Sequence, residues 1–353
     1  MDVIIAAWNR EDTIGRAVAS ALAEPEVLSV VVVDDGSKDE TAKRARWADD
    51  GSNRLTVLQL PKNGGPAAAR NAALSYSGSS APWIAVLDGD YFLLPGRFSG
   101  LLAQAHGYDA IADDLLQVHE ECLDVDIRLL ARAEQFEAWN CDLRGFVLGN
   151  ISRKGRHRKE LGFLKPLIRR SFLEKHRLRY DETLRLGEDY VFYARLLALG
   201  AHFRIVPACG YVSVIRSGSL SDKHSKQDLE RLRDIDCVLE GLPGLSGAER
   251  ATIRKHQESV DARVQWLEVI EATKARDASR ILRAYRRSPH VAQYISARLG
   301  EQLFERTAKR LKAFTKAPKG NRLSPFSGPL GSWGVADPET NSQCGLNSQG
   351  ISW

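Results

Sequence analysis

The chain has 353 residues, of which 43% are hydrophobic and 27% charged, and it carries a formal net charge of +5. These proportions are ordinary for a globular protein with one large core or two smaller ones, and so mild a charge does not indicate a nucleic-acid partner. The five cysteines are widely spaced without a Cys-x-x-Cys motif, which argues against a disulfide framework or a zinc site and favours a reducing compartment.

No apolar run reaches the roughly 18 residues of a membrane-spanning helix, and the run Val3–Trp8 is too short for a signal peptide. We therefore expect a cytoplasmic protein whose contact with the inner membrane, if any, is peripheral. The candidate for such contact is the basic stretch from Arg306 to Arg322, in which Leu311 and Phe314 are interleaved with lysines and arginines. The basic end of a soluble helix would explain the same pattern.

The first hundred residues alternate between apolar runs and helical periodicity. The runs predict strands at 3–7, 28–33, 54–58 and 83–87, and the periodic stretches predict helices at 12–22, 39–48 and 66–76. This rhythm predicts an α/β fold, a mostly parallel central sheet with helices on both faces. Ligands of such sheets bind beyond the carboxyl ends of the strands, so we expect the polar residues there to share one cleft. These residues are Asn9, Asp34, Asp35, Asp88 and Asp90.

The pattern after residue 100 is mixed and then helical. Strands are predicted at 108–112, 202–206 and 211–215, and helices at 170–176 and 188–199. We expect one domain over 1–221, a helical region over 222–316, and a flexible tail over 317–353, which is rich in Gly, Ser, Pro and Asn.

Asp88-Gly89-Asp90 directly follows the predicted strand at 83–87. Two carboxylates one residue apart can bind Mg²⁺ or Mn²⁺, and such a cation can hold a diphosphate. Acidic turns are common, however, so this triplet gains its weight only from its neighbours.

Three further clusters carry side chains of suitable chemistry. Asp35 follows the second strand and can accept hydrogen bonds from a base or ribose. A glycine-rich turn leads into the helix that carries Arg70, whose guanidinium can fork onto a phosphate. Glu188-Asp189 begins a later helix, where Asp189 could deprotonate an attacking hydroxyl. Taken singly, these clusters could also be a turn, a surface ion pair and a helix-terminal acid pair.

The order and spacing of the four clusters resemble the family-2 glycosyltransferases of the nucleotide-diphospho-sugar transferase (GT-A) fold, over roughly residues 1–220. The stretches 162–170, 179–189 and 210–221 are similar to those of succinoglycan-type bacterial exopolysaccharide glucosyltransferases. Two positions depart from the family pattern. Tyr91 stands where a third acid often follows the metal-binding pair, and Trp8-Asn9 replaces the usual Tyr-Asn.

The resemblance implies a role for each motif residue. Asp189 would be the general base, with Glu188 beside it, and Asp90 would bind the metal together with Asp88, which would also approach the ribose. The remaining nucleotide contacts would come from Asn9, Asp35 at the uracil, Arg70, and Arg216 at the diphosphate. The implied reaction is an inverting, metal-dependent transfer of a hexose, glucose first among them, from a UDP-sugar to a lipid-linked oligosaccharide in exopolysaccharide synthesis.

Two other functions stay open from the sequence. A sugar-nucleotidyltransferase would share the sheet and the metal acids, but it needs a glycine-rich loop after the first strand, and residues 8–12 contain no glycine. A noncatalytic UDP-sugar-binding module of a polysaccharide assembly complex would bind UDP without turnover. A dinucleotide-binding enzyme is disfavoured because no Gly-x-Gly-x-x-Gly follows the first strand.

Overall fold

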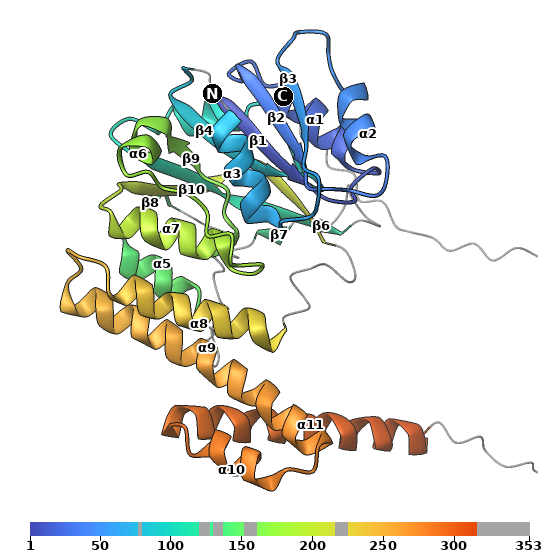
Figure 1. The fold of residues 1–353 in the computed structure, drawn as a ribbon, viewed down its shortest axis with the longest axis vertical. Coiled ribbons are helices and arrows are strands. Elements are labelled where there is room, and N and C mark those ends of the chain that lie inside the picture. The colour runs from blue at the N-terminus through green and yellow to red at the C-terminus, as the bar shows by residue number, and fades with distance from the viewer. Residues whose placement is uncertain (77–79, 120–127, 130–136, 152–160, 216–224, 316–353) are drawn as a thin grey trace, which may run out of the picture. The chain divides into compact units, whose positions relative to one another are not determined.

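The computed structural model describes residues 1–76, 80–119, 128–129, 137–151, 161–215 and 225–315 (Figure 1). The chain divides into two units, Met1–Gly300 and Glu301–Trp353. The described part of the second unit is the last section of helix α11 (Pro289–Thr315). The tail predicted over 317–353 and the site candidate Arg216 lie outside the described residues.

The N-terminal third forms the parallel half of the sheet. Its strands lie in the order β3-β2-β1-β4, and every neighbouring pair is parallel. The apolar runs of the sequence form these strands, and the periodic stretches form the helices between them. The elements are β1 (Asp2–Ala7), α1 (Ile14–Leu22), β2 (Ser29–Asp34), α2 (Thr41–Trp47), β3 (Leu55–Gln59), α3 (Pro66–Tyr76) and β4 (Trp83–Asp88).

The strand order decides which face each helix covers. The chain moves outward from β1 to β3 and then returns past β1 to β4. Because parallel crossovers are right-handed, this reversal places α1 and α2 on one face and α3 on the other (Figure 1). The reversal beside β1 is the switch point at which open α/β sheets bind their ligands.

Beyond β4 the sheet is mixed, whereas the sequence predicts a mostly parallel one. Strand β9 (Leu167–Arg169) runs antiparallel to both of its neighbours, β4 and β6 (Ala110–His119). The separate strands predicted at 202–206 and 211–215 are one strand, β10 (Phe203–Ile215), which is parallel to β6. The shorter strands are β5 (Phe92–Leu93), β7 (Arg128–Leu129) and β8 (Trp139–Cys141).

The register of β10 shifts against β6 between Val206 and Tyr211. Asp113 lies beside this irregularity and accepts hydrogen bonds from the amides of Cys209 and Tyr211, at 3.0 and 3.4 Å. Its other oxygen pairs with the fully buried Arg97, which also donates to the carbonyl of Lys165 at 2.8 Å. The Arg97–Asp113 pair therefore ties three segments together inside the core.

Helices α5, α7, α8 and α9 stack on one another beside the mixed part of the sheet, and α10 packs against α9 farther from it (Figure 1). Both α8 and α9 begin with a capping box, at Ser225 and Ser246, and leucines of α8 join the main hydrophobic core. In chain order, the helical elements between β4 and α11 are α4 (Arg97–Leu102), α5 (Leu143–Gly149), a 3₁₀ turn (Leu161–Phe163), α6 (Arg170–Lys175), α7 (Glu188–Ala198), α8 (Lys226–Glu240), α9 (Gly247–Lys274) and α10 (Ala278–Tyr285).

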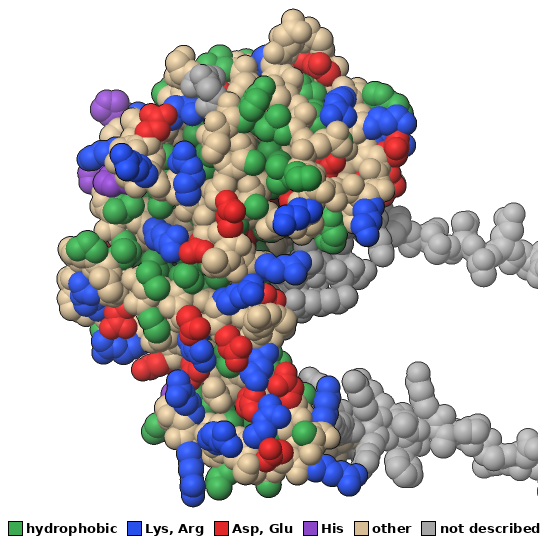
Figure 2. Space-filling view, in the orientation of Figure 1, with side chains coloured by type: hydrophobic (Ala, Val, Ile, Leu, Met, Phe, Trp, Pro, Cys, Tyr) green, Lys and Arg blue, Asp and Glu red, His purple; other side chains and the backbone are tan. Residues whose placement is uncertain are grey.

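The outer surface of α8 and α9 is a charged one. Figure 2 shows basic and acidic side chains interspersed over this region, and several of them pair, among them Lys226 with Glu268 and Arg254 with Glu240. None of the helices in the described residues combines the length and apolar character that crossing a membrane requires. The proposed domain boundary at residue 221 stays a prediction.

Candidate active site

Two strands, β2 and β4, bring acidic residues to the edge of the sheet at which β1 also ends. In the pairing register, Asp34 of β2 lies opposite Ala7 of β1, and Asp88 of β4 lies opposite Ala6. The carboxyl ends of β2 and β4 therefore flank the end of β1 on both sides. This arrangement is the one expected at a switch point.

The glycine of Asp88-Gly89-Asp90 lies where the turn passes close to β1. Its amide donates to the carbonyl of Ala6 at 3.2 Å, and a Cβ at position 89 would lie 3.0 Å from that of Ala7. A side chain at position 89 would push the turn and β1 apart by a few tenths of an ångström. The turn holds Asp88 and Asp90 against the end of the neighbouring strand.

Asp35 organises the glycine-rich turn before α3. Its two carboxylate oxygens accept hydrogen bonds from the amides of Gly64 and Gly65, both at 2.8 Å. Burial raises the pKa of Asp35, and these two amides partly oppose the rise. The carboxylate thus fixes the loop at the start of α3, and its expected contact with uracil stays a prediction.

Arg70 is the centre of a buried ionic cluster. Its guanidinium lies 2.7 Å from Asp88 Oδ1, 3.0 Å from Glu188 Oε1 and 2.9 Å from Asp189 Oδ1. The side chain is only 4% exposed, and its charge lies over the ring of Tyr180. One residue of α3 therefore brings together acids from β4 and α7 that are about a hundred positions apart in the chain.

Lys165 completes this cluster, and the sequence analysis assigns it no role. Its ammonium lies 3.1 Å from Asp88 Oδ2 and 2.5 Å from Asp189 Oδ2. Both carboxylates therefore bridge one arginine and one lysine. The available signal was a lysine inside the apolar run from Leu164 to Ile168, since a buried lysine needs an acidic partner.

We call the group formed by Arg70, Asp88, Lys165, Glu188 and Asp189 the ionic cluster. Within it, the pKa values of two carboxyl groups shift in opposite directions. Burial disfavours the charged form of Asp88, but Lys165 and Arg70 outweigh it and lower the pKa of Asp88 to about 2. Burial and the adjacent charge of Asp189 raise the pKa of Glu188. Neighbouring acids with divergent pKa values are typical of sites that handle protons.

Glu188 and Asp189 occupy the first turn of α7, where the helix dipole favours negative charge. The residue before them, Gly187, has a φ of +76° and caps the helix, and a Cβ there would lie 3.0 Å from Leu232 of α8. The next residue, Tyr190, donates its hydroxyl to Asp236 of α8 at 3.2 Å. Helix α8 therefore contacts the residue before Glu188-Asp189 and the residue after it.

Asp236 belongs to a second buried cluster. Its other oxygen lies 2.7 Å from His256 Nδ1 of α9, and the ring of Tyr190 stacks on that histidine. Burial raises the pKa of Asp236, and His256 partly opposes the rise. Tyr190, Asp236 and His256 form a closed polar contact between α7, α8 and α9.

Asn9 and Asp90 lie at the rim of the site. Asn9 has a φ of +50°, and its side chain accepts a hydrogen bond from the amide of Lys38 at 3.0 Å. Asp90 Oδ2 lies 3.2 Å from Arg10 Nε, and the Asp90 side chain is 21% exposed. Both predicted residues therefore stand at the ends of β1 and β4, outside the buried cluster.

The fit of a divalent cation differs between the two aspartates. Both oxygens of Asp88 already face cationic side chains, so it would have to exchange one of them for the metal. Asp90 faces Arg10 with one oxygen, and its side chain is about as exposed as that of Asp88, at 21% against 22%. Within the described residues, no three or more His, Cys, Asp or Glu side chains gather closely enough to hold a metal by themselves. A cation here would take most of its oxygen ligands from a bound diphosphate.

A pocket of about 610 Å³ adjoins this edge of the sheet. Trp8 and Asp34 line it, together with residues 59–63, which lead from β3 into the glycine-rich turn. Its position beside the end of β2 suits a planar base with an attached ribose.

The sheet order and the helices that cover it are those of the GT-A fold of glycosyltransferases. The structure of S. aureus TarS 1–349 in complex with UDP-GlcNAc superposes with a TM-score of 0.60 at 18% identity, covering 85% of this chain and 91% of that one. The mannosyltransferase PcManGT from Pyrobaculum calidifontis, in complex with GDP-Man and Mn²⁺, gives 0.53 at 14% identity, covering 89% and 84%. At these identities the likeness is one of fold.

The chain belongs to glycosyl transferase family 2. The family model of that description matches residues 2–165. The succinoglycan biosynthesis protein ExoU of Rhizobium meliloti (strain 1021) is 50% identical over 267 residues, which is 74% of this chain and 76% of ExoU. ExoO of the same organism is 33% identical over 306 residues, or 85% of each chain. The predicted family, fold and enzyme class are thus confirmed.

Proposed function

We propose that this glycosyltransferase moves a hexose, glucose first among the candidates, from a UDP-sugar to a hydroxyl of a lipid-linked oligosaccharide, with inversion at the anomeric carbon. The observation that carries the proposal is the position of Asp189, which Arg70 and Lys165 hold by separate oxygens within one cluster that also contains Asp88. The relatives named for succinoglycan biosynthesis support a role in making such an exopolysaccharide.

Asp189 would act as the general base in a single displacement. The acceptor oxygen forms a bond to the anomeric carbon, the bond from that carbon to the UDP oxygen breaks, and the electron pair leaves with UDP. The proton of the acceptor hydroxyl passes to Asp189, a contribution typically of about 10²–10⁴-fold in rate. One displacement inverts the configuration.

Arg70 and Lys165 would serve this step in two ways. They fix both oxygens of Asp189, so the carboxylate cannot rotate away from the acceptor. They also place two positive charges beside Asp88, near the nucleotide edge, where negative charge grows on the departing UDP. Glu188, whose pKa is raised, would keep a proton to higher pH than an ordinary glutamate.

The pocket lined by Trp8 and Asp34 would hold the nucleobase, and Asp35 would shape its wall by fixing the adjacent glycine turn. Asp90, with Asp88, would hold a Mg²⁺ or Mn²⁺ ion on the donor diphosphate, which would neutralise charge on the leaving group. The expected contacts of Asn9 and Arg216 with the donor, and of the basic stretch from Arg306 with a membrane, belong to the same proposal.

A transfer assay tests the proposal directly. The purified protein is incubated with a panel of UDP-sugars, lipid-linked oligosaccharide and Mg²⁺ or Mn²⁺, and UDP release, product mass and anomeric configuration are measured. We expect metal-dependent, inverted product with UDP-glucose. Nucleotide-sugar formation from UTP and a sugar phosphate would instead support a nucleotidyltransferase. UDP-sugar binding without product from any acceptor would support a noncatalytic module.

A further inference from the structure

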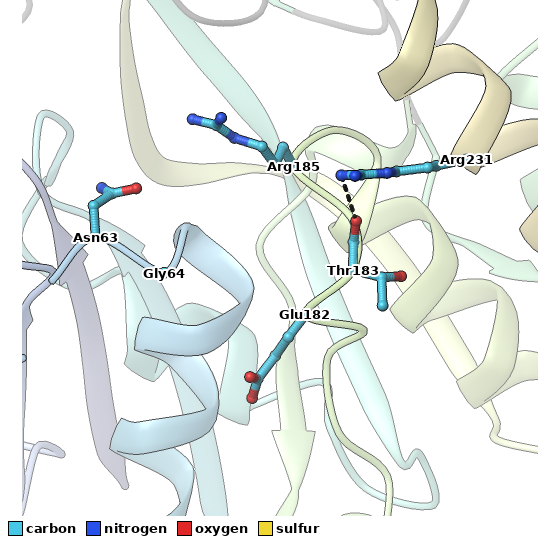
Figure 3. Close-up of a pocket in the computed structure, with 6 residues that line it drawn as sticks. All are labelled: Asn63, Gly64, Glu182, Thr183, Arg185 and Arg231. Carbon is cyan, nitrogen blue, oxygen red and sulfur yellow. Dashed lines mark hydrogen bonds between the residues drawn. The ribbon is translucent and has the colours of Figure 1, made fainter.

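A second pocket, of about 560 Å³, shares Asn63 with the nucleobase pocket, and Figure 3 shows the residues that line it. Its walls come from the glycine-rich turn before α3, from the segment that precedes α7, and from α8. The lining residues are Asn63, Gly64, Glu182, Thr183, Arg185 and Arg231. The volume is within the usual range of small-molecule sites.

The pocket has an excess of positive charge. Arg185 is exposed and makes no hydrogen bond or ion pair within the described part of the chain. Arg231 donates one N–H to the carbonyl of Thr183, at 3.2 Å, and pairs with no carboxylate in the described residues. Figure 3 shows the guanidinium of Arg231 beside Thr183 and that of Arg185 extending away from Thr183, toward the side of Asn63. Two forks of N–H donors in one cavity suit an oxyanion.

The one acid in the pocket is already engaged. Glu182 accepts a hydrogen bond from the side chain of Asn71 at 2.8 Å, and Asn71 also donates to the carbonyl of Tyr180 at 3.0 Å. The residue before Asn71 is Arg70, which bonds Asp189. Adjacent residues of α3 therefore hold the pocket wall and the proposed base.

Helix α8 fixes the opposite wall. Arg231 contacts Thr183, and the following residue, Leu232, packs against Gly187. The segment from Thr183 to Gly187 leads directly into the acid pair. An acceptor must reach Asp189 with its hydroxyl, so a group bound in this pocket would orient that acceptor, whereas the donor is expected at the ends of β1, β2 and β4.

We infer that this pocket binds an oxyanion of the acceptor, a phosphate or a carboxylate, through Arg185 and Arg231. The inference deepens the proposed function and rests on it for the identity of the acceptor. It also gives the helical region a part in acceptor choice, because Arg231 belongs to α8.

A binding experiment tests the pocket without turnover. The protein is saturated with UDP, so that the donor site is filled, and titrated by calorimetry with inorganic pyrophosphate or with glucuronate. We expect binding of at least one of them, weakened about tenfold or more in Arg185→Gln/Arg231→Gln. Binding of glucuronate alone would identify the oxyanion as a carboxylate. Arg179→Gln, an exposed arginine in the same connecting segment, is the matched control and should bind as the wild type does.

A kinetic experiment assigns the pocket to acceptor or donor. Using oligosaccharide acceptors with and without a phosphate, we expect Arg185→Gln to raise KM about tenfold only for the phosphorylated one, and to leave UDP affinity within about twofold. Weakened UDP binding would assign the pocket to the donor and overturn the inference, as would the absence of any arginine-dependent anion binding. Failure of the wild type to transfer sugar would contradict the proposed function instead, whatever the titrations show.

Discussion

The first turn of α7 separates two buried polar clusters of different design. Asp189 belongs to the ionic cluster, whose five members are all ionisable and reach the surface at Asp88, with 22% of its side chain exposed. Tyr190, the next residue, belongs to the Tyr190–Asp236–His256 cluster, in which Asp236 is fully buried. Burying charges is costly unless they are paired, so the open ionic cluster fits the proposed chemistry, and the closed cluster fits a role in holding helices together.

Asp189→Asn should give the largest effect and tests the chemical side of this comparison. The amide keeps the shape of the side chain but cannot accept the acceptor's proton, so kcat should fall about 10²–10⁴-fold while UDP affinity changes little. Turnover and UDP binding are measured on the same preparation. The matched control is Asp234→Asn, an exposed acid paired with Arg233. Near-normal turnover would remove Asp189 as the base.

Lys165→Met should affect both stability and turnover. It leaves Asp88 and Asp189 without one cation each, and breaking a buried pair costs about 3–5 kcal/mol. Chemical denaturation measures the loss in free energy of unfolding. The double variant Lys165→Met/Asp189→Asn should recover part of that loss while remaining inactive, because the uncompensated charge is gone. Strictly additive losses would show that the lysine does not serve Asp189.

His256→Phe tests the closed cluster. The ring still stacks on Tyr190, but Asp236 loses its ring nitrogen partner, so the free energy of unfolding should fall by about 1–3 kcal/mol. Turnover per folded molecule should stay within about threefold of the wild type. Tyr190→Phe, which removes only the 3.2 Å hydrogen bond, should cost about 1 kcal/mol. A larger loss of turnover than of stability would mean that this cluster also serves the chemistry.

Asp88→Asn should change the free energy of unfolding by an amount that depends on pH. The folded pKa of Asp88 is about 2, below the ordinary value of 3.8, so its contribution is present above that ordinary value and is lost as the pH falls through about 2. The stability difference between wild type and variant should therefore shrink by on the order of 2 kcal/mol between pH 5 and pH 2. A difference that is constant with pH would contradict the ion pairing.

Much of the parallel half of the sheet could be predicted because each strand there is a short apolar run with polar residues at its end. The mixed half could not, since β9 has only three residues and its direction is set by long-range packing. The two strands expected at 202–215 are joined because Asp113 satisfies amides at the irregularity, and nothing in the local sequence of β10 shows that partner.

The site was predictable where a motif carries the chemistry and not where distant partners define it. Asp88, Glu188, Asp189 and Arg70 stand in recognisable local patterns, and the structure brings them into contact. Lys165 could not be assigned, because its two acidic partners are 77 and 24 positions away in the chain. The hydrogen bonds that Asp35 accepts from the amides of Gly64 and Gly65 could not be predicted either, because that loop is distant in sequence.

The contacts of α8 with residues 183–190 also bear on how this enzyme can be engineered. Arg231, Leu232 and Asp236 of α8 contact Thr183, Gly187 and Tyr190, respectively. A chimera that exchanges α8 and α9 between relatives should therefore transplant residues 183–190 with them. Exchanging the helices alone would leave mismatched partners one residue from the base.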